Sequence, residues 1–94
     1  MTRIVKMTFK PEAIESFREM FVAYRERIAS AEGCTHLELL QDKHDPRIFF
    51  TVSNWKDESF LEKYRKSDLF GEVWPITKGM FEEPAEAWTC DAKQ

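Results

Sequence analysis

Residues 55–74 read WKDESFLEKYRKSDLFGEVW and decide how the second half of the chain folds. Within this stretch, Phe60, Leu61 and Tyr64 recur at helical spacing and form one apolar face. Asp57 can accept hydrogen bonds from the first backbone N–H groups of such a helix. The pattern therefore predicts a short helix that begins just after Asp57.

A second short helix is predicted in the same stretch. Ser67 and Asp68 can each cap its N-terminus, and four apolar residues follow at helical spacing. Pro75 lacks a backbone N–H, so we expect this helix to kink or end near Trp74. The two helices should meet at residues 66–67, with Tyr64 and Trp74 facing the same space. The apolar residues of the second helix are Leu69, Phe70, Val73 and Trp74.

Working outward, the first third of the chain predicts a strand and then a long helix. Residues 3–10 alternate in polarity and are rich in β-formers. Pro11 suits the first turn of a helix, and Gly33 suits the end of one. Apolar residues between them step by three and four, which predicts an amphipathic helix of about 20 residues. These residues are Ile14, Phe17, Phe21, Tyr24, Ile28 and Ala31.

The remaining segments complete a recognisable order of elements. Residues 35–42 and 48–55 have strand patterns, and a polar turn joins them into a hairpin. Pro84 then interrupts the chain, and residues 87–91 predict a short last strand. The order β-α-β-β-α-β is that of the split βαβ, or ferredoxin-like, α+β fold. Right-handed crossovers place the third strand between the first two, and residues 1–94 form one domain.

Composition excludes several classes of protein. The net charge is −3 and the basic residues are scattered, which excludes a nucleic-acid-binding stripe. No apolar run approaches the roughly 18 residues of a membrane span, and residues 1–7 do not resemble a signal-peptide core. Cys34 and Cys90 are too few and too distant for a metal motif or a disulfide framework. We therefore expect a cytoplasmic protein with free thiols.

Both faces of the predicted sheet carry large apolar groups, but helices can cover only one of them. A monomer would expose a larger apolar patch than soluble monomers usually show, so we expect a homodimer. A mixed face suits a ligand site better than a uniformly apolar one. The pattern alone does not decide which face meets the helices. On the mixed face, we expect Lys6 to pair with Glu38. That face comprises Ile4, Lys6, Thr8, His36, Glu38, Leu40, Phe49, Thr51, Ser53 and Trp55. The uniform face comprises Val5, Met7, Phe9, Leu37, Leu39, Ile48, Phe50 and Val52.

Several of these features together resemble one family. They are Trp55 with the nine-residue step to Tyr64, the KSDLF run at residues 66–70, and Gly33 before a strand. In this order and spacing, the chain resembles the antibiotic biosynthesis monooxygenase (ABM) family over residues 4–88. The resemblance implies a dimeric α+β barrel, with two protomers closing the barrel and a ligand site between each sheet and its own helices. Because a ligand site suits the mixed face, the resemblance also places the mixed face, with His36, under the helices.

The resemblance also implies an activity. Some relatives oxidise quinols or polycyclic phenols with O₂ and no cofactor, and the substrate anion supplies the electron. Such a reaction needs a dry aromatic pocket, a base, and donors for the developing negative charge. We predict that His36 is the base and that Asn54 orients a substrate oxygen, so both are catalytic. The predicted substrate-binding residues are Tyr24, Ser53, Tyr64 and Trp74.

Other interpretations of the same residues stay open. His36 can be a hydrogen-bonded interface residue, and the aromatic residues can be ordinary core. The chain can also be a non-catalytic small-ligand-binding or stress-related dimer, or a heme-binding protein. Heme-degrading relatives carry an Asn, a Trp and a His where this chain has Ile4, Tyr64 and Trp74. Without that histidine, iron ligation of the same kind is not expected, and we predict no metal and no cofactor.

Overall fold

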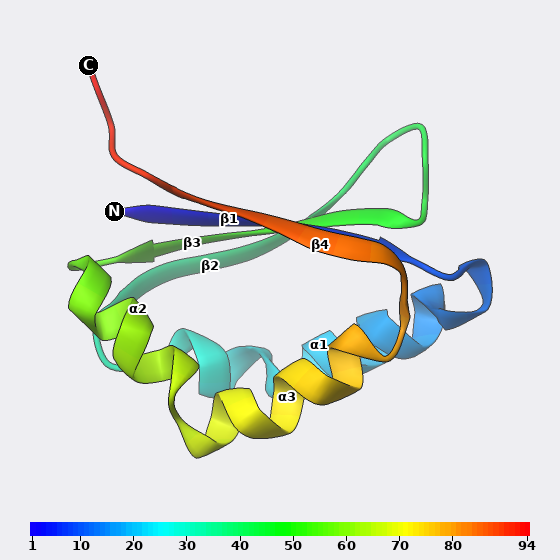
Figure 1. Cartoon of the computed structure of the whole chain (residues 1–94), viewed down its shortest axis with the longest axis horizontal. Coiled ribbons are helices and arrows are strands. Elements are labelled where there is room, and N and C mark those ends of the chain that lie inside the picture. Colours follow the sequence, from blue (N-terminus) through cyan, green and yellow to red (C-terminus); the bar gives the residue numbers. More distant parts are fainter.

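The computed structural model describes all 94 residues as two layers. In Figure 1, a four-stranded sheet lies above three helices, which all cover the same face. The strand order is β2-β3-β1-β4 and every pairing is antiparallel, which confirms the ferredoxin-like fold. A short 3₁₀ turn at Pro11–Ala13 precedes the first helix. The other elements are β1 (Thr2–Phe9), α1 (Ile14–Ala29), β2 (Cys34–Gln41), β3 (Ile48–Trp55), α2 (Glu58–Arg65), α3 (Asp68–Lys78) and β4 (Phe81–Cys90).

Both helices of the organising stretch are capped as the sequence predicts. The Asp57 carboxylate accepts the backbone N–H of Ser59 at 2.7 Å and begins α2. The Ser67 hydroxyl accepts the backbone N–H of Phe70 at 3.2 Å and begins α3. Each cap satisfies a donor that the first helical turn leaves without an intrahelical partner. The two helices therefore meet at residues 66–67.

Two prolines lie inside elements that the sequence expected them to interrupt. The helix α3 does not end near Trp74 but continues through Pro75 to Lys78, so of the two expected outcomes, a kink or an end, the end is wrong. Pro75 and Gly71, four residues earlier, are both exposed, so water can reach the Gly71 carbonyl that lacks a helical partner. The strand β4 is also longer than expected, because Pro84 lies inside it. The pairing with β1 shifts between Lys6 and Thr8, and a proline without an N–H is tolerated at such a bulge on an edge strand.

The register of the sheet corrects the assignment of its faces. Val5 pairs with Thr51 and Met7 pairs with Phe49, so odd-numbered residues of β1 and β3 point to the same side. That side meets the helices, because Met7 and Phe49 are buried with α1 in the core. The expectation that His36 lies under the helices is therefore wrong. The uniform face predicted from the sequence combined odd-numbered residues of β1 and β2 with even-numbered residues of β3.

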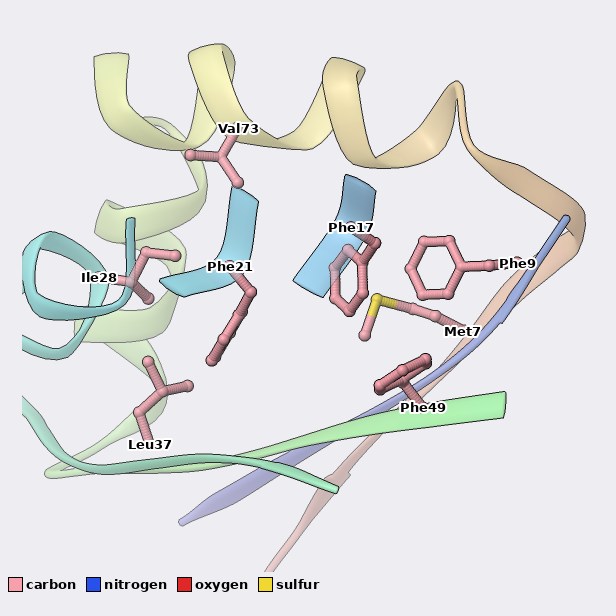
Figure 2. Close-up of a cluster of buried hydrophobic side chains, with 8 residues drawn as sticks. All are labelled: Met7, Phe9, Phe17, Phe21, Ile28, Leu37, Phe49 and Val73. Carbon is pink, nitrogen blue, oxygen red and sulfur yellow. The ribbon is translucent and has the colours of Figure 1, made fainter. Parts of the chain in front are cut away.

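The core lies between the sheet and α1. Figure 2 shows that Met7, Phe9, Phe17 and Phe49 gather at one end, whereas Ile28 and Leu37 lie at the other. The rings of Phe9 and Phe17 stack with their centroids 4.1 Å apart. Phe49 approaches both rings edge-on, at 5.7 Å and 5.3 Å between centroids. This end of the layer is therefore closed by packed aromatic rings.

The opposite face of the sheet carries no helix. Leu40 remains 46% exposed and Trp88 remains 47% exposed on it, although both are large apolar residues. Lys6 lies on this face but pairs with Glu86 at 3.8 Å rather than with Glu38, because β3 separates β1 from β2. None of the three helices has the length and the apolar composition that a membrane span requires. The apolar residues of this outer face are Ile4, Leu40, Ile48, Phe50, Val52 and Trp88.

Candidate functional site

A cavity of about 330 Å³ lies between the helix-facing side of the sheet and the helices. This volume falls within the range of small-molecule sites, which hold about 300–1,000 Å³. Most of its wall is apolar or aromatic, and the polar groups are few. The lining residues are Arg3, Val5, Met7, Phe17, Met20, Phe21, Ile28, Leu37, Thr51, Ser53, Trp55, Leu61, Tyr64, Arg65, Phe70, Val73, Trp74, Thr77, Ala85 and Ala87.

One wall of the cavity is a continuous series of aromatic rings. Trp55, at the end of β3, lies 5.4 Å from Tyr64 of α2, measured between ring centroids. Tyr64 meets Phe70 edge-on at 5.4 Å, and Phe70 stacks on Trp74 at 5.7 Å. The two caps position this series, since they fix where α2 and α3 begin. Rings arranged in this way can hold a flat aromatic ligand through stacking and edge contacts.

Hydroxyl groups of β3 face the cavity beside these rings. The buried Ser53 hydroxyl accepts the indole N–H of Trp55 at 2.9 Å. This bond leaves the Ser53 hydroxyl proton available to a ligand oxygen. Thr51 lines the same wall two residues earlier. Thr77 is less available, because its hydroxyl donates to the Val73 carbonyl at 2.9 Å within α3.

Tyr64 presents a neutral phenol to the cavity. Burial raises the pKa of its hydroxyl to about 12, and the nearby Cys34 adds to the rise. The hydroxyl therefore keeps its proton at neutral pH. A neutral phenol can donate a hydrogen bond to an oxygen that becomes negative during a reaction.

The charged groups of the lining are two arginines, Arg3 of β1 and Arg65 of α2. Burial lowers the pKa of the Arg3 guanidinium, and the positive charge of Arg65 lowers it further. Arg3 donates to the Thr89 hydroxyl at 2.9 Å, and Arg65 donates to Glu62 on its own helix at 3.3 Å. The cavity wall contains no carboxylate, so its charge is positive.

The structure brings together three of the six predicted site residues. Ser53, Tyr64 and Trp74 all line the cavity. Tyr24 does not line it; its ring lies 5.3 Å from the Arg27 guanidinium carbon, and contact with the Glu72 carboxylate raises its pKa.

The two predicted catalytic residues lie on the outer face. The His36 Nε2 atom is 3.5 Å from a carboxylate oxygen of Glu38. The Asn54 side-chain oxygen accepts the Thr2 hydroxyl at 2.9 Å, and Asn54 pairs with His36 across the strands. Their catalytic role stays a prediction, but it does not act from within the cavity of their own chain.

Four polar residues of the cavity lining were not among the predicted site residues: Arg3, Thr51, Arg65 and Thr77. Arg3 directly faces Ser53 in the register of β1 and β3, and it faces Thr89 in that of β1 and β4. The sequence already grouped Thr51 with Ser53 on one face, and a correct pairing of β1 with β3 would have added Arg3 to them. Arg65 lies four residues after Leu61, which also lines the cavity, so helical spacing was the available signal.

The cavity offers a heme iron or a structural metal neither an imidazole nor a thiolate, because its lining has no histidine and no cysteine. The lining side chains of a type that ligates heme iron are Met7, Met20 and Tyr64. No three side chains of His, Cys, Asp or Glu come together as a metal site. Cys34 and Cys90 are free thiols.

Together, the fold and the cavity define a small ferredoxin-like α+β protein with an aromatic-lined cavity beneath its helices. The chain belongs to the antibiotic biosynthesis monooxygenase family, whose sequence profile matches residues 1–73. No curated protein matches it.

Solved structures show the same fold. A conserved protein from Methanosarcina mazei Go1 is 29% identical, with a TM-score of 0.85 over 92% of this chain and 86% of that one. An antibiotic biosynthesis monooxygenase is 21% identical, with a TM-score of 0.91 and complete coverage of both chains. A Mycobacterium tuberculosis protein is 14% identical, with a TM-score of 0.87 over 99% of this chain and 95% of that one.

Proposed function

We propose that this protein is a cofactor-independent monooxygenase that oxidises a small electron-rich aromatic, of quinol or phenol type, inside the cavity. The observation that carries the proposal is the composition of the cavity wall, in which a series of aromatic rings adjoins hydroxyl and guanidinium donors. Aromatic walls hold a flat ring and exclude water. The donors lie where an oxygen anion on that ring can be stabilised.

The chemistry in this proposal belongs to the substrate. A quinol anion transfers an electron to O₂, and the resulting radical pair joins to form a carbon–oxygen bond. The hydroperoxide then loses water and leaves a hydroxyquinone. One oxygen atom of O₂ enters the product and the other leaves as water, so the substrate supplies all the electrons and no separate reductant is needed.

Formation of the substrate anion is assisted by charge in this proposal. The cavity lining has neither an imidazole nor a carboxylate that can take the proton. Arg3 and Arg65 instead lower the pKa of a bound phenol, because a nearby positive charge favours the ionised form. The hydroxyls of Ser53 and Tyr64 donate to the same oxygen. The proton leaves to water at the open part of the site.

The assembly in this proposal is a cytoplasmic homodimer. Large apolar residues on the outer face, including Leu40 and Trp88, are about half exposed in the single chain. A second copy that packs sheet against sheet removes them from water. His36 and Asn54 then lie between the protomers. A contribution of either residue to the reaction acts through this interface.

Oxygen uptake with a panel of hydroquinones tests the reaction, and oxygen-18 gas shows whether one labelled atom enters the product. Loss of one donor to a developing oxygen anion typically costs about a hundredfold in kcat. We therefore expect Ser53→Ala and Tyr64→Phe to reduce kcat by about that factor. His44→Ala, in the exposed hairpin turn, is the control. His36→Ala, assayed beside them, tests the predicted catalytic role of that residue.

A second candidate function is non-catalytic binding of a small aromatic ligand. The absence of an imidazole or carboxylate from the cavity lining favours it. Binding of hydroquinones without oxygen uptake across the whole panel would establish this function instead. Oxygen uptake that survives both Ser53→Ala and Tyr64→Phe would place the reaction outside the cavity.

A further inference from the structure

We infer that the ligand of the cavity is an aromatic molecule that carries an anionic oxygen group, a carboxylate or a phosphate, and that Arg3 and Arg65 bind this group. The inference rests on the proposed ligand site but not on the proposed oxidation. The charged groups of the cavity lining are all of one sign. Two guanidinium groups line the cavity, and no Asp or Glu does.

Neither guanidinium is saturated by its contacts within the protein. A guanidinium has five N–H donors. Arg3 makes one side-chain hydrogen bond, to the neutral hydroxyl of Thr89 at 2.9 Å, and it has no carboxylate partner. Arg65 makes a 3.3 Å bond to Glu62, one turn earlier on the same helix. Both side chains of that pair are nearly half exposed, at 45% and 46%, which makes it a weak surface pair.

The two guanidinium groups act on one another. Burial lowers the pKa of Arg3 and the charge of Arg65 lowers it further, whereas Glu62 and Glu58 raise it from the α2 side. Neither of these carboxylates lines the cavity, so they offset the charge from outside. An anion inside would relieve the repulsion between the two arginines and gain charge-assisted hydrogen bonds.

The register places this charged pair at one end of the cavity. Arg3 faces Ser53 on one side and Thr89 on the other, near the start of β1 and the end of β3. In Figure 1, α2 lies at that same end of the sheet. The opposite end is closed by the packed rings around Phe9 and Phe17. A bound molecule therefore has its anionic group near the arginines and its ring system along Tyr64, Phe70 and Trp74.

The size of the cavity limits the ring system. A cavity of about 150 Å³ holds one benzene molecule. The space here is about 330 Å³, roughly twice as large. It accommodates one ring or two fused rings with an anionic substituent.

Isothermal titration calorimetry with three naphthalene ligands of similar shape tests the inference. They are 2-naphthoate, 2-naphthyl phosphate and the neutral 2-naphthamide. Hydrogen bonds to a charged group typically change affinity by about tenfold or more. We expect at least one anion to bind about tenfold more tightly than the amide, and the stronger of the two anions identifies the group. Added salt should weaken binding of that anion and leave the amide unchanged.

Variants assign the preference to the two arginines. Arg65→Gln, on the exposed side of α2, should lower affinity for the anion about tenfold and leave affinity for the amide unchanged. Arg3→Gln should do the same, and Arg3→Lys should restore part of the loss because it keeps the charge. Arg18→Gln is the matched control, because Arg18 also pairs with a glutamate three residues away on a helix but lies outside the cavity.

The outcomes separate this inference from the proposed reaction. Equal binding of the anions and the amide would overturn it, as would anion binding that Arg65→Gln leaves unchanged. A protein that prefers an anion through the two arginines but consumes no O₂ would support the inference and remove the oxidation. Oxidation of neutral quinols by a protein without any anion preference would do the reverse.

Discussion

Replacement of Gly33 by alanine should destabilise the protein strongly, although the added group is one methyl. Gly33 has a φ of +84°, in the left-handed region. An alanine costs about 1–2 kcal/mol there. A Cβ atom at this position would also lie within 2.8 Å of three carbon atoms of the Phe60 side chain. Phe60 belongs to the first turns of α2, so relief of the overlap displaces the helix that carries Tyr64 and Arg65.

The expected magnitude combines these two terms. Displacement of the half-buried Phe60 ring forfeits part of the roughly 1.5–3 kcal/mol that full burial of such a side chain contributes. The sum is about 2–4 kcal/mol, which lowers the melting temperature of a domain of this size by on the order of 10–25 °C. Urea unfolding, followed by circular dichroism at one fixed protein concentration, measures the free energy of unfolding.

Two further variants make the measurement specific. In a Phe60→Gly background all three overlapping atoms, the Phe60 Cβ included, are gone, so Gly33→Ala should cost only the backbone term of about 1–2 kcal/mol. Gly71→Ala is the control, because no atom lies within 4 Å of the added Cβ and the position is helical. It should be neutral or stabilise by up to about 1 kcal/mol. Gly33→Ala within about 0.5 kcal/mol of the parent protein would refute the reasoning.

Three other predictions concern pH, a helix and the assembly. The Tyr64 hydroxyl has its pKa raised to about 12 in the folded protein, so the unfolded chain, with a pKa of about 10, loses this proton first. Stability should therefore fall by up to about 2 kcal/mol as the pH rises from 10 to 12, and Tyr64→Phe should reduce that fall in alkaline urea titrations. Pro75→Ala should restore the hydrogen bond from the backbone N–H of residue 75 to the Gly71 carbonyl and stabilise the protein by about 1–3 kcal/mol in thermal melts. An unchanged melting temperature would show that Pro75 does not destabilise α3. Leu40→Glu should weaken the proposed dimer at least about a hundredfold in sedimentation experiments and leave the subunit folded. The control is Val22→Glu on α1, where the Val22 side chain is 76% exposed, and it should leave the assembly unchanged.

The parts of the fold that follow from local interactions could be predicted from the sequence. The caps at Asp57 and Ser67 depend on a side chain and a backbone N–H only two or three residues away, so their signal survives without knowledge of the tertiary structure. The course of the chain at Pro75 and Pro84 could not be predicted in this way. It depends on solvent at the Gly71 carbonyl and on a bulge against β1, both of which are set by the rest of the fold.

The candidate site was only partly predictable, because the polarity of the residues did not distinguish the helix-facing side of the sheet from the outer side. In a sheet with one solvated face, apolar residues identify the buried side. Here both sides carry large apolar residues, such as Met7 on one and Phe50 on the other. Only the pairing of strands decides between them, and a shift of one residue moves every side chain to the other face. Grouping residues by polarity therefore placed His36 beneath the helices.

Correct pairing changes which chemistry the cavity can perform. In the correct pairing, the cavity lining has no imidazole and instead includes Arg3, next to Ser53, together with Arg65 of α2. An imidazole would accept a proton, whereas a guanidinium only stabilises an anion that forms by itself. In the proposed reaction, the acidity of the substrate then limits the rate. The outer face, with Leu40 and His36, is the interface of the proposed dimer, so under these proposals one side of the sheet binds the ligand and the other side binds the second protomer.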